Sequence, residues 1–238
     1  MDFTLKKYGE LLYALGKGDF TFKNYLENKS SCILLRHDVD RAPGNALKMA
    51  RLENSCGVKA SYYFRVPFDV QVVERIARRG HEIGYHYECL DKARGDVEKA
   101  IKIFEEELKL FRNWNVKTIA MHGNPLSKWN NLDMWNKADF KKYGLIGEAY
   151  LSVDFSKINY FTDTGRRWNS ERFSVKDKPG VKLISVKNTD ELIRKLKSKE
   201  IKNAYILTHP NRWNDQLLPW AVELIWQNAK NIGKGLLR

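Results

Sequence analysis

Asp38 and Asp40 lie two residues apart in the motif RHDVD (residues 36–40), directly after a short apolar run. Because strand side chains alternate between two faces, both carboxylates are expected on one face, with His37 on the other. Two carboxylates at a strand end suit a hydrolase, since one can bind a metal ion while the other moves a proton. They can also simply cap a helix, because Asp is common where a strand gives way to a loop.

The histidines favour a shared site. His86 ends the motif GHEIGYH (80–86), while His122 and His209 each follow an apolar run that is typical of a strand. The ends of parallel strands meet at one edge of a sheet, so we expect these histidines to lie near the two aspartates. His37, on the opposite face, and His81, at the start of its strand, are expected to be structural hydrogen-bonding residues.

Strands and helices alternate along the chain, which predicts an α/β fold with a parallel sheet or barrel. We expect one domain over 1–238, with an N-terminal helical extension over 1–30 and an elaborated loop and β region over 123–180. Helices are expected over 3–15, 45–55, 69–79, 92–113, 189–198 and 214–230. Strands are expected over 32–37, 59–66, 81–87, 116–121, 182–186 and 204–208, with short β segments near 145–153, 157–163 and 172–176.

The cysteines and the apolar segments indicate which classes of protein are excluded. The three cysteines, Cys32, Cys56 and Cys89, show no CxxC spacing, which argues against a disulfide framework and a structural zinc knot and favours a reducing compartment. We find no signal-peptide pattern and no apolar run of transmembrane length, so we expect a soluble, cytoplasmic protein.

The formal charge of +13 is the excess of 42 lysines and arginines over 29 aspartates and glutamates. The basic residues are spread along the chain, and many of them lie beside glutamates on expected helices. This pattern is typical of solvated helix faces and predicts no specific nucleic-acid partner. It is compatible with attraction to an anionic substrate or to membrane headgroups.

Taken in order, HDVD, GHEIGYH, MHGNP (121–125), DTGRRW (163–168) and LTH (207–209) resemble the motifs of the NodB-type polysaccharide deacetylases, carbohydrate esterase family four. The resemblance covers about residues 33–210. It implies a distorted (β/α) barrel that uses one divalent metal ion, for which we expect zinc, to remove acetyl groups from N-acetylated sugars. It gives Asp38 the place of the general base, Asp40 and His86 those of metal ligands, and His209 that of the acid which protonates the leaving amine.

Two departures from the family pattern matter. The second metal histidine of the family lies four residues beyond the first, where this chain has Leu90, and the arginine that orients the base is missing from MHGNP. His122 and Glu88 are the two candidates for the third ligand. We prefer His122, because it restores a set of two histidines and one carboxylate, and Glu88 remains a capping or substrate-contacting alternative.

Four further residues come from DTGRRW. Asp163 is expected to orient His209 or an arginine, and Arg166 or Arg167 to replace the missing arginine or to bind an anionic group of the substrate. Trp168 offers a flat apolar surface on which a sugar ring can stack.

The resemblance implies a metal-dependent hydrolase of C–N bonds, most simply an N-deacetylase of an acetamido sugar in surface polysaccharide or glycan biosynthesis. A cytoplasmic location suggests a nucleotide-linked or lipid-linked carbohydrate substrate. Two alternatives stay open: a catalytically impaired relative that binds sugars or acts as a scaffold, and a different metal hydrolase, for example of phosphate esters, on the same barrel. The sequence does not predict an oligomeric state.

Overall fold

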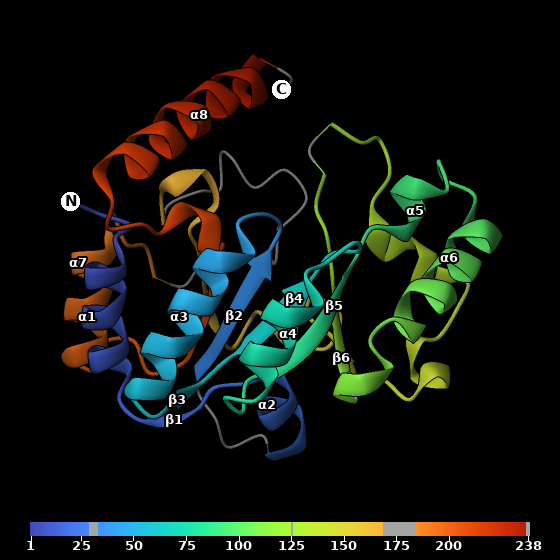
Figure 1. Ribbon diagram of the computed structural model, residues 1–238, viewed down its shortest axis with the longest axis horizontal. Helices are drawn as coiled ribbons and strands as arrows, with labels where there is room; N and C mark the ends of the chain where they lie inside the picture. The colour runs from blue at the N-terminus through green and yellow to red at the C-terminus, as the bar shows by residue number, and fades with distance from the viewer. Residues whose placement is uncertain (29–32, 125, 169–183, 237–238) are drawn as a thin grey trace.

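A seven-stranded sheet forms the centre of the molecule (Figure 1). The computed structural model describes residues 1–28, 33–124, 126–168 and 184–236. The strand order is β7-β6-β5-β4-β2-β9-β8, and all neighbouring strands are parallel. These strands are β2 (Ile33–Val39), β4 (Ser61–Phe64), β5 (Glu82–Tyr87), β6 (Thr118–Met121), β7 (Gly147–Glu148), β8 (Asn159–Thr162) and β9 (Ala204–Thr208). The predicted α/β class is confirmed, and over the described residues the sheet is open between β7 and β8.

Helices connect most of the strands. The α-helices are α1 (Leu5–Leu15), α2 (Phe22–Asn28), α3 (Pro43–Ser55), α4 (Val70–Ala77), α5 (Cys89–Lys92), α6 (Val97–Lys109), α7 (Thr189–Lys197) and α8 (Leu217–Leu236). Short 3-10 helices are η1 (Arg112–Trp114), η2 (Asn131–Asn136), η3 (Phe140–Tyr143), η4 (Thr164–Arg166) and η5 (Pro210–Arg212), and β1 (Gly18–Asp19) pairs with β3 (Val58–Lys59). Asp69, Asp96 and Asn188 cap α4, α6 and α7 by accepting backbone N–H groups.

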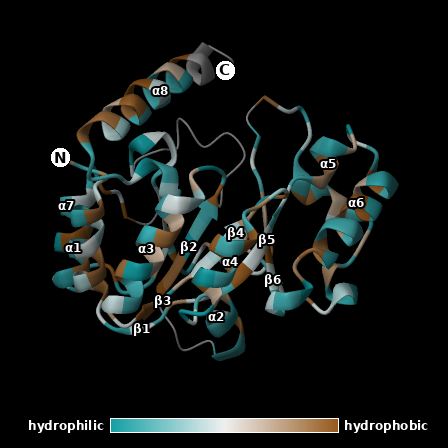
Figure 2. Ribbon diagram, in the orientation of Figure 1, coloured by the Kyte–Doolittle hydropathy of each residue, from teal (hydrophilic) through white to brown (hydrophobic). Residues whose placement is uncertain are grey.

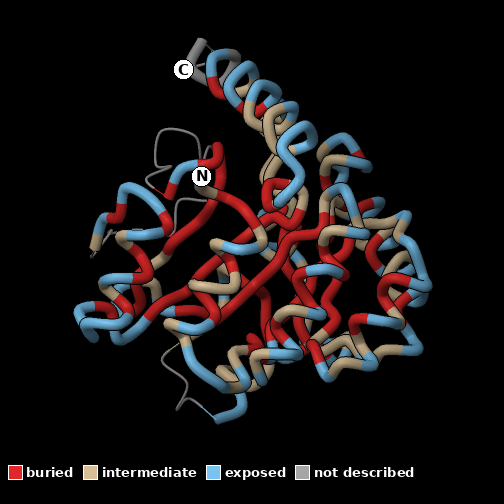
Figure 3. Tube along the Cα trace, turned by 60° about the vertical axis from the view of Figure 1, so that its left-hand side comes forward, coloured by how far each residue is buried: buried red, intermediate tan, exposed pale blue. Residues whose placement is uncertain are grey.

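The strands are the most buried part of the chain, as Figure 3 shows. Every residue of β4, β6 and β9 is buried. Such continuous burial is expected of a parallel sheet that is covered on both faces, and it holds the strand ends in fixed positions. In Figure 2, β2 changes from hydrophobic at its start to hydrophilic at its end, where the motif RHDVD lies.

Two predicted elements differ from the structure. The helix expected over 92–113 is divided into α5 and α6, because Arg94 (φ 54°) and Gly95 (φ 90°) adopt the left-handed conformation that ends a helix. The described part of the strand expected over 182–186, residues 184–186, has no strand, while residues 182–183 and the segment 172–176 lie outside the described residues. Helix α2 lies within the N-terminal extension, but it was not among the helices expected from the sequence.

Candidate functional site

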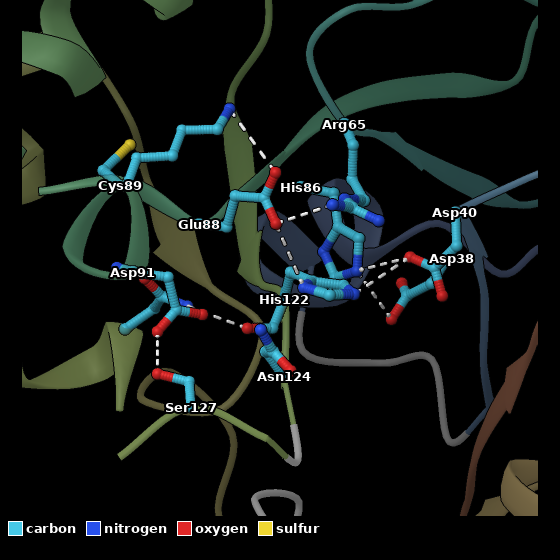
Figure 4. A network of polar contacts seen from close by, with 12 residues as sticks. Asp38, Asp40, Arg65, His86, Glu88, Cys89, Asp91, His122, Asn124 and Ser127 are labelled. Carbon is cyan, nitrogen blue, oxygen red and sulfur yellow. Dashed lines mark hydrogen bonds and ion pairs between the residues drawn. The ribbon is translucent and has the colours of Figure 1, made fainter. Parts of the chain in front are cut away.

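Three strands end around one group of polar side chains, shown in Figure 4. Asp40 follows β2, His86 lies near the end of β5, and His122 follows β6. Each of the three offers one ligand atom, and these atoms all lie within 4.8 Å of one another. The structure therefore brings together the two histidines and the carboxylate that the sequence predicts as metal ligands.

The hydrogen bonds of this group suit a divalent metal ion. His86 donates from Nδ1 to the Ala120 carbonyl at 2.9 Å, which fixes the ring and leaves Nε2 facing Asp40 Oδ1 at 3.5 Å. Asp40 Oδ1 is buried and has no hydrogen-bond partner among the described residues. A histidine held by a backbone carbonyl through its other nitrogen, next to an unpartnered carboxylate oxygen, is the arrangement that a metal site requires.

Charge at the group is set by these neighbours. Burial by itself raises the pKa of Asp40, but the nearby His86 ring and the charges of His122, His86 and His209 together hold that pKa well below its usual value. Burial lowers the pKa of His86, and the charges of Asp38 and Asp40 outweigh it and raise that pKa. The carboxylate is thus ionised, as a metal ligand must be.

Glu88 lies behind His122. The His122 Nε2 atom is 3.6 Å from Asp40 Oδ1, and its Nδ1 atom is 3.4 Å from Glu88 Oε2. Glu88 also accepts a hydrogen bond from Arg65 at 2.7 Å and lies 3.4 Å from Lys92 Nζ. Although burial raises the pKa of Glu88, the nearby His122 ring and the hydrogen bond from Arg65 lower that pKa to about 2. Glu88 is therefore placed to orient His122, as outer carboxylates do for metal-binding histidines.

Asp38 forms a buried ion pair with Arg36, two residues before it on the same strand face. The Arg36 Nε–Asp38 Oδ1 distance is 2.7 Å and the Nη2–Oδ2 distance is 2.8 Å, and the two side chains are 1% and 4% exposed. Asp38 Oδ2 also lies 3.5 Å from His86 Nε2. Burial raises the pKa of Asp38, while the charges of Arg36, His86 and His209 outweigh it and lower that pKa.

Arg36 is held in place by three tyrosines. Its Nη1 donates to the Tyr205 hydroxyl at 3.0 Å, and its guanidinium lies 5.2 Å and 4.8 Å from the ring centroids of Tyr63 and Tyr150. The arginine that contacts the predicted base is thus Arg36, a residue that the sequence interpretation missed. The sequence could have indicated this contact, because Arg36 is two residues before Asp38 and residues i and i+2 share a strand face.

His209 and Asp163 form a second pair at the ends of β9 and β8. His209 donates from Nδ1 to Asp163 Oδ1 at 2.7 Å, and its backbone N–H donates to Asp163 Oδ2 at 2.9 Å. Arg212 and Trp213 donate to the same carboxylate at 2.6 and 2.8 Å. Burial raises the pKa of Asp163, but the charges of Arg212 and His209 bring it down to about 2. The structure places Asp163 where the sequence predicted, against His209 and an arginine.

Arg166 packs against Phe3 and against Trp220 of α8. Arg166 is buried, donates from Nη1 to the Trp220 carbonyl at 2.9 Å, and lies over the rings of Phe3 and Trp220. Arg167 is exposed. The arginine that binds both oxygens of Asp38 is Arg36, and binding of an anionic group of the substrate by Arg166 or Arg167 stays a prediction.

Trp168 lies in the core. It is 2% exposed, its ring packs near Phe3 and Trp213, and its Nε1 donates to Thr189 Oγ1 at 2.8 Å. Residues that are distant in sequence thus cover the indole, and its faces are closed to a sugar ring. The expected stacking role does not agree with this placement.

The back face of β2 carries a separate buried network around Glu53. Its Oε1 is 2.8 Å from His37 Nε2 and also accepts the Tyr8 hydroxyl, and its Oε2 accepts the Tyr62 hydroxyl at 2.7 Å. His81 Nδ1 lies 3.4 Å from Oε2, and its Nε2 donates to the Ala50 carbonyl at 3.0 Å. His37 and His81 are structural hydrogen-bonding residues, as predicted.

Comparison with known proteins gives matches in structure only. No protein-family model and no curated protein matches the sequence. Two solved structures with a similar fold are a CE4 family pseudoenzyme from Bacillus anthracis and a mutant of it with restored enzymatic activity. Sequence identity is 13% in each case, with TM-scores of 0.41 and 0.40, over 84% of this chain and 60% and 62% of theirs. The chain thus spans about three fifths of the structures it matches, and the likeness concerns the fold alone. Both belong to the family whose motifs this sequence resembles.

Proposed function

We propose that this chain is a metal-dependent hydrolase that removes the acetyl group from an acetamido sugar. The observation that carries the proposal is the position of the three candidate ligands, Asp40, His86 and His122, beside Asp38. A second polar pair, His209 and Asp163, is near enough for the charge of His209 to lower the pKa of both Asp38 and Asp40. A metal ligand set beside a carboxylate and an oriented histidine is suited to hydrolysis of an amide.

Asp40, His86 and His122 would hold the metal ion, for which we propose zinc because two histidines and a carboxylate suit it. When bound there, the ion supplies a Lewis acid that polarises a carbonyl and makes a water molecule more acidic. Asp38, ionised and next to His86, accepts the proton of the attacking water. His209, whose Nδ1 is bonded to Asp163, delivers a proton from Nε2 to the leaving amine.

The substrate that we propose is a sugar linked to a nucleotide or a lipid in glycan assembly. Such substrates carry phosphate, and the formal charge of the chain is +13. A positive protein attracts anionic substrates over distances of about a Debye length, ~8–10 Å at physiological salt.

One observation favours a second candidate, a protein that binds sugars without turnover. Both oxygens of Asp38 accept charged hydrogen bonds from Arg36. A carboxylate stabilised in this way is a weak base, because its ionised form is favoured at the expense of the protonated form. Asp38 acts as a base only if it can accept a proton while it is paired with Arg36, or if substrate binding weakens that ion pair.

Metal content and acetate release test the proposal together. Purified protein is expected to contain about one divalent ion per chain, and His122→Ala to lose it. The matched control is Glu88→Gln, which changes the carboxylate behind His122. This variant is expected to retain the metal, with an affinity reduced about 10–100-fold.

The metal-loaded protein is then assayed against free, nucleotide-linked and lipid-linked N-acetylhexosamines, and against phosphate esters. Acetate release that is lost in Asp38→Asn, with metal content unchanged, supports the deacetylase. Sugar binding without acetate release, and with equal affinity in Asp38→Asn, supports the binding protein. Turnover of phosphate esters alone would contradict both.

A further inference from the structure

The C-terminal helix α8 presents its polar side to the protein and its apolar side to solvent. Glu223, Gln227 and Asn231 face the body of the molecule, and Gln227 and Asn231 are buried. On the opposite side lie five apolar residues that are 50–75% exposed, which we call the outer face of α8: Leu218, Val222, Ile225, Trp226 and Ile232. A helix on the surface of a soluble protein normally has the reverse arrangement.

Polar contacts fix this orientation. Asn231 Nδ2 donates to the Gly165 carbonyl at 3.0 Å, and Asn211 Nδ2 donates to Glu223 Oε1 at 2.8 Å. The Trp220 carbonyl accepts from Arg166 Nη1 at 2.9 Å. Rotating the helix to bury its apolar side would break these bonds, so the outer face remains on the surface.

The outer face is large and continuous. Its residues, at positions 218, 222, 225, 226 and 232, fall on one side of the helix over a length of about 21 Å. Together they expose on the order of 600 Å² of apolar surface, the upper limit of the ~300–600 Å² found for the largest patch on a typical monomer. Figure 1 shows α8 at the rim of the molecule, where a flat partner can reach it. A patch of this size is expected to be covered by a partner.

The net charge of the chain indicates which kind of partner covers the outer face. The chain carries a formal charge of +13, so two copies repel each other while an anionic surface attracts them. None of the acidic residues of the chain lies on the outer face, and Lys230 Nζ lies 5.0 Å from the Trp226 ring centroid. A basic side chain beside a tryptophan at the edge of an apolar stripe is typical of helices that lie in a membrane interface.

From these observations we propose that the outer face of α8 docks on an anionic lipid bilayer, with the helix lying along the surface. No helix among the described residues is long and apolar enough to cross a membrane, so α8 rests on the bilayer and does not span it. α8 packs on η5, the turn that follows His209. Docking therefore brings the candidate site near the headgroups, where a lipid-linked sugar would be. This consequence rests on the proposed function, whereas the docking itself does not.

Co-sedimentation of the full chain with vesicles tests the docking. The protein is expected to bind vesicles that contain phosphatidylglycerol, to bind pure phosphatidylcholine vesicles at least about tenfold more weakly, and to dissociate at high salt. The pair Ile225→Gln and Trp226→Gln removes two large apolar groups and is expected to reduce the partition coefficient about tenfold or more. The matched control is the pair Leu110→Gln and Leu151→Gln, which removes apolar groups of similar exposure (54% and 52%) away from α8 and should bind as the wild type does.

Two results would overturn the proposal: no binding of the wild type to anionic vesicles, or equal binding of the outer-face pair. Analytical ultracentrifugation is run in parallel. A wild-type dimer that the same pair converts to monomer, without vesicle binding, would show that a second copy covers the face. Metal content is measured on every variant and should not change, so failure of the docking and failure of the proposed chemistry are separable.

Discussion

Glu53 contacts His37 on the opposite face of β2 from Asp38. The Glu53→Gln substitution measures how much this buried carboxylate stabilises the folded protein. Glu53 is fully buried, and although burial raises its pKa, its interactions with His37, His81 and Tyr8 lower that pKa from 4.5 to about 2. A shift of about 2.5 units corresponds to on the order of 3 kcal/mol of unfolding free energy near neutral pH. Because the folded pKa is depressed, this stability is present above about pH 4.5 and is lost as the pH falls toward about 2.

Glutamine keeps the size of the side chain and removes the charge. We therefore expect Glu53→Gln to be less stable than the wild type by about 3 kcal/mol near pH 7 and by only about 1 kcal/mol near pH 3. With the unfolding entropy of a chain of this length, a loss of about 3 kcal/mol corresponds to a fall in Tm of roughly 6 °C.

Urea denaturation of both proteins at a series of pH values gives the difference directly. Other buried carboxylates, such as Asp163 and Glu88, titrate in the same range, but they contribute equally to both proteins and cancel. The reasoning is refuted if the difference in unfolding free energy is the same near pH 7 and near pH 3. A difference that grows as the pH falls would mean that Glu53 is protonated in the folded state.

Three further outcomes are expected. Arg36→Leu removes the charge that lowers the pKa of Asp38, so that pKa should rise and the acid limb of the pH profile of kcat/KM should move to higher pH; an unmoved limb would exclude Asp38 as the titrating base. Asp163→Asn should reduce kcat about 10²-fold or more with little change in KM, because the orientation of His209 is lost, and unchanged kcat would exclude His209 as the acid. Trp168→Ala should cost about 3–5 kcal/mol of unfolding free energy, whereas equal stability with weaker sugar binding would restore the stacking role.

The ends of the strands could be predicted from the sequence because each combines an apolar run with a polar residue directly after it. In a parallel sheet those ends share one edge, and this is how Asp40, His86 and His122 come together. The sequence favours His122 over Glu88 as the third ligand only through ligand chemistry, because both residues are near the end of a strand. The structure adds a physical reason, since Glu88 is paired with Arg65 behind the histidine.

Arg36 and Trp168 show where sequence patterns fail. The period of a strand places Arg36 on the face of Asp38, but the three tyrosines that hold it come from other parts of the chain. Trp168 is buried by Phe3 and Trp213, which are 165 and 45 residues away. Such contacts depend on tertiary packing, about which local spacing says nothing. The break between α5 and α6 is different, since Gly95 was a visible signal.

The position of β2, between β4 and β9, divides the candidate site into two halves that come from different strands. The candidate metal ligands other than Asp40 come from β5 and β6, on one side of β2, whereas His209 and Asp163 come from β9 and β8 on the other. A substitution of a candidate metal ligand on the β5 and β6 side is therefore expected to leave the hydrogen bonds between His209 and Asp163 in place.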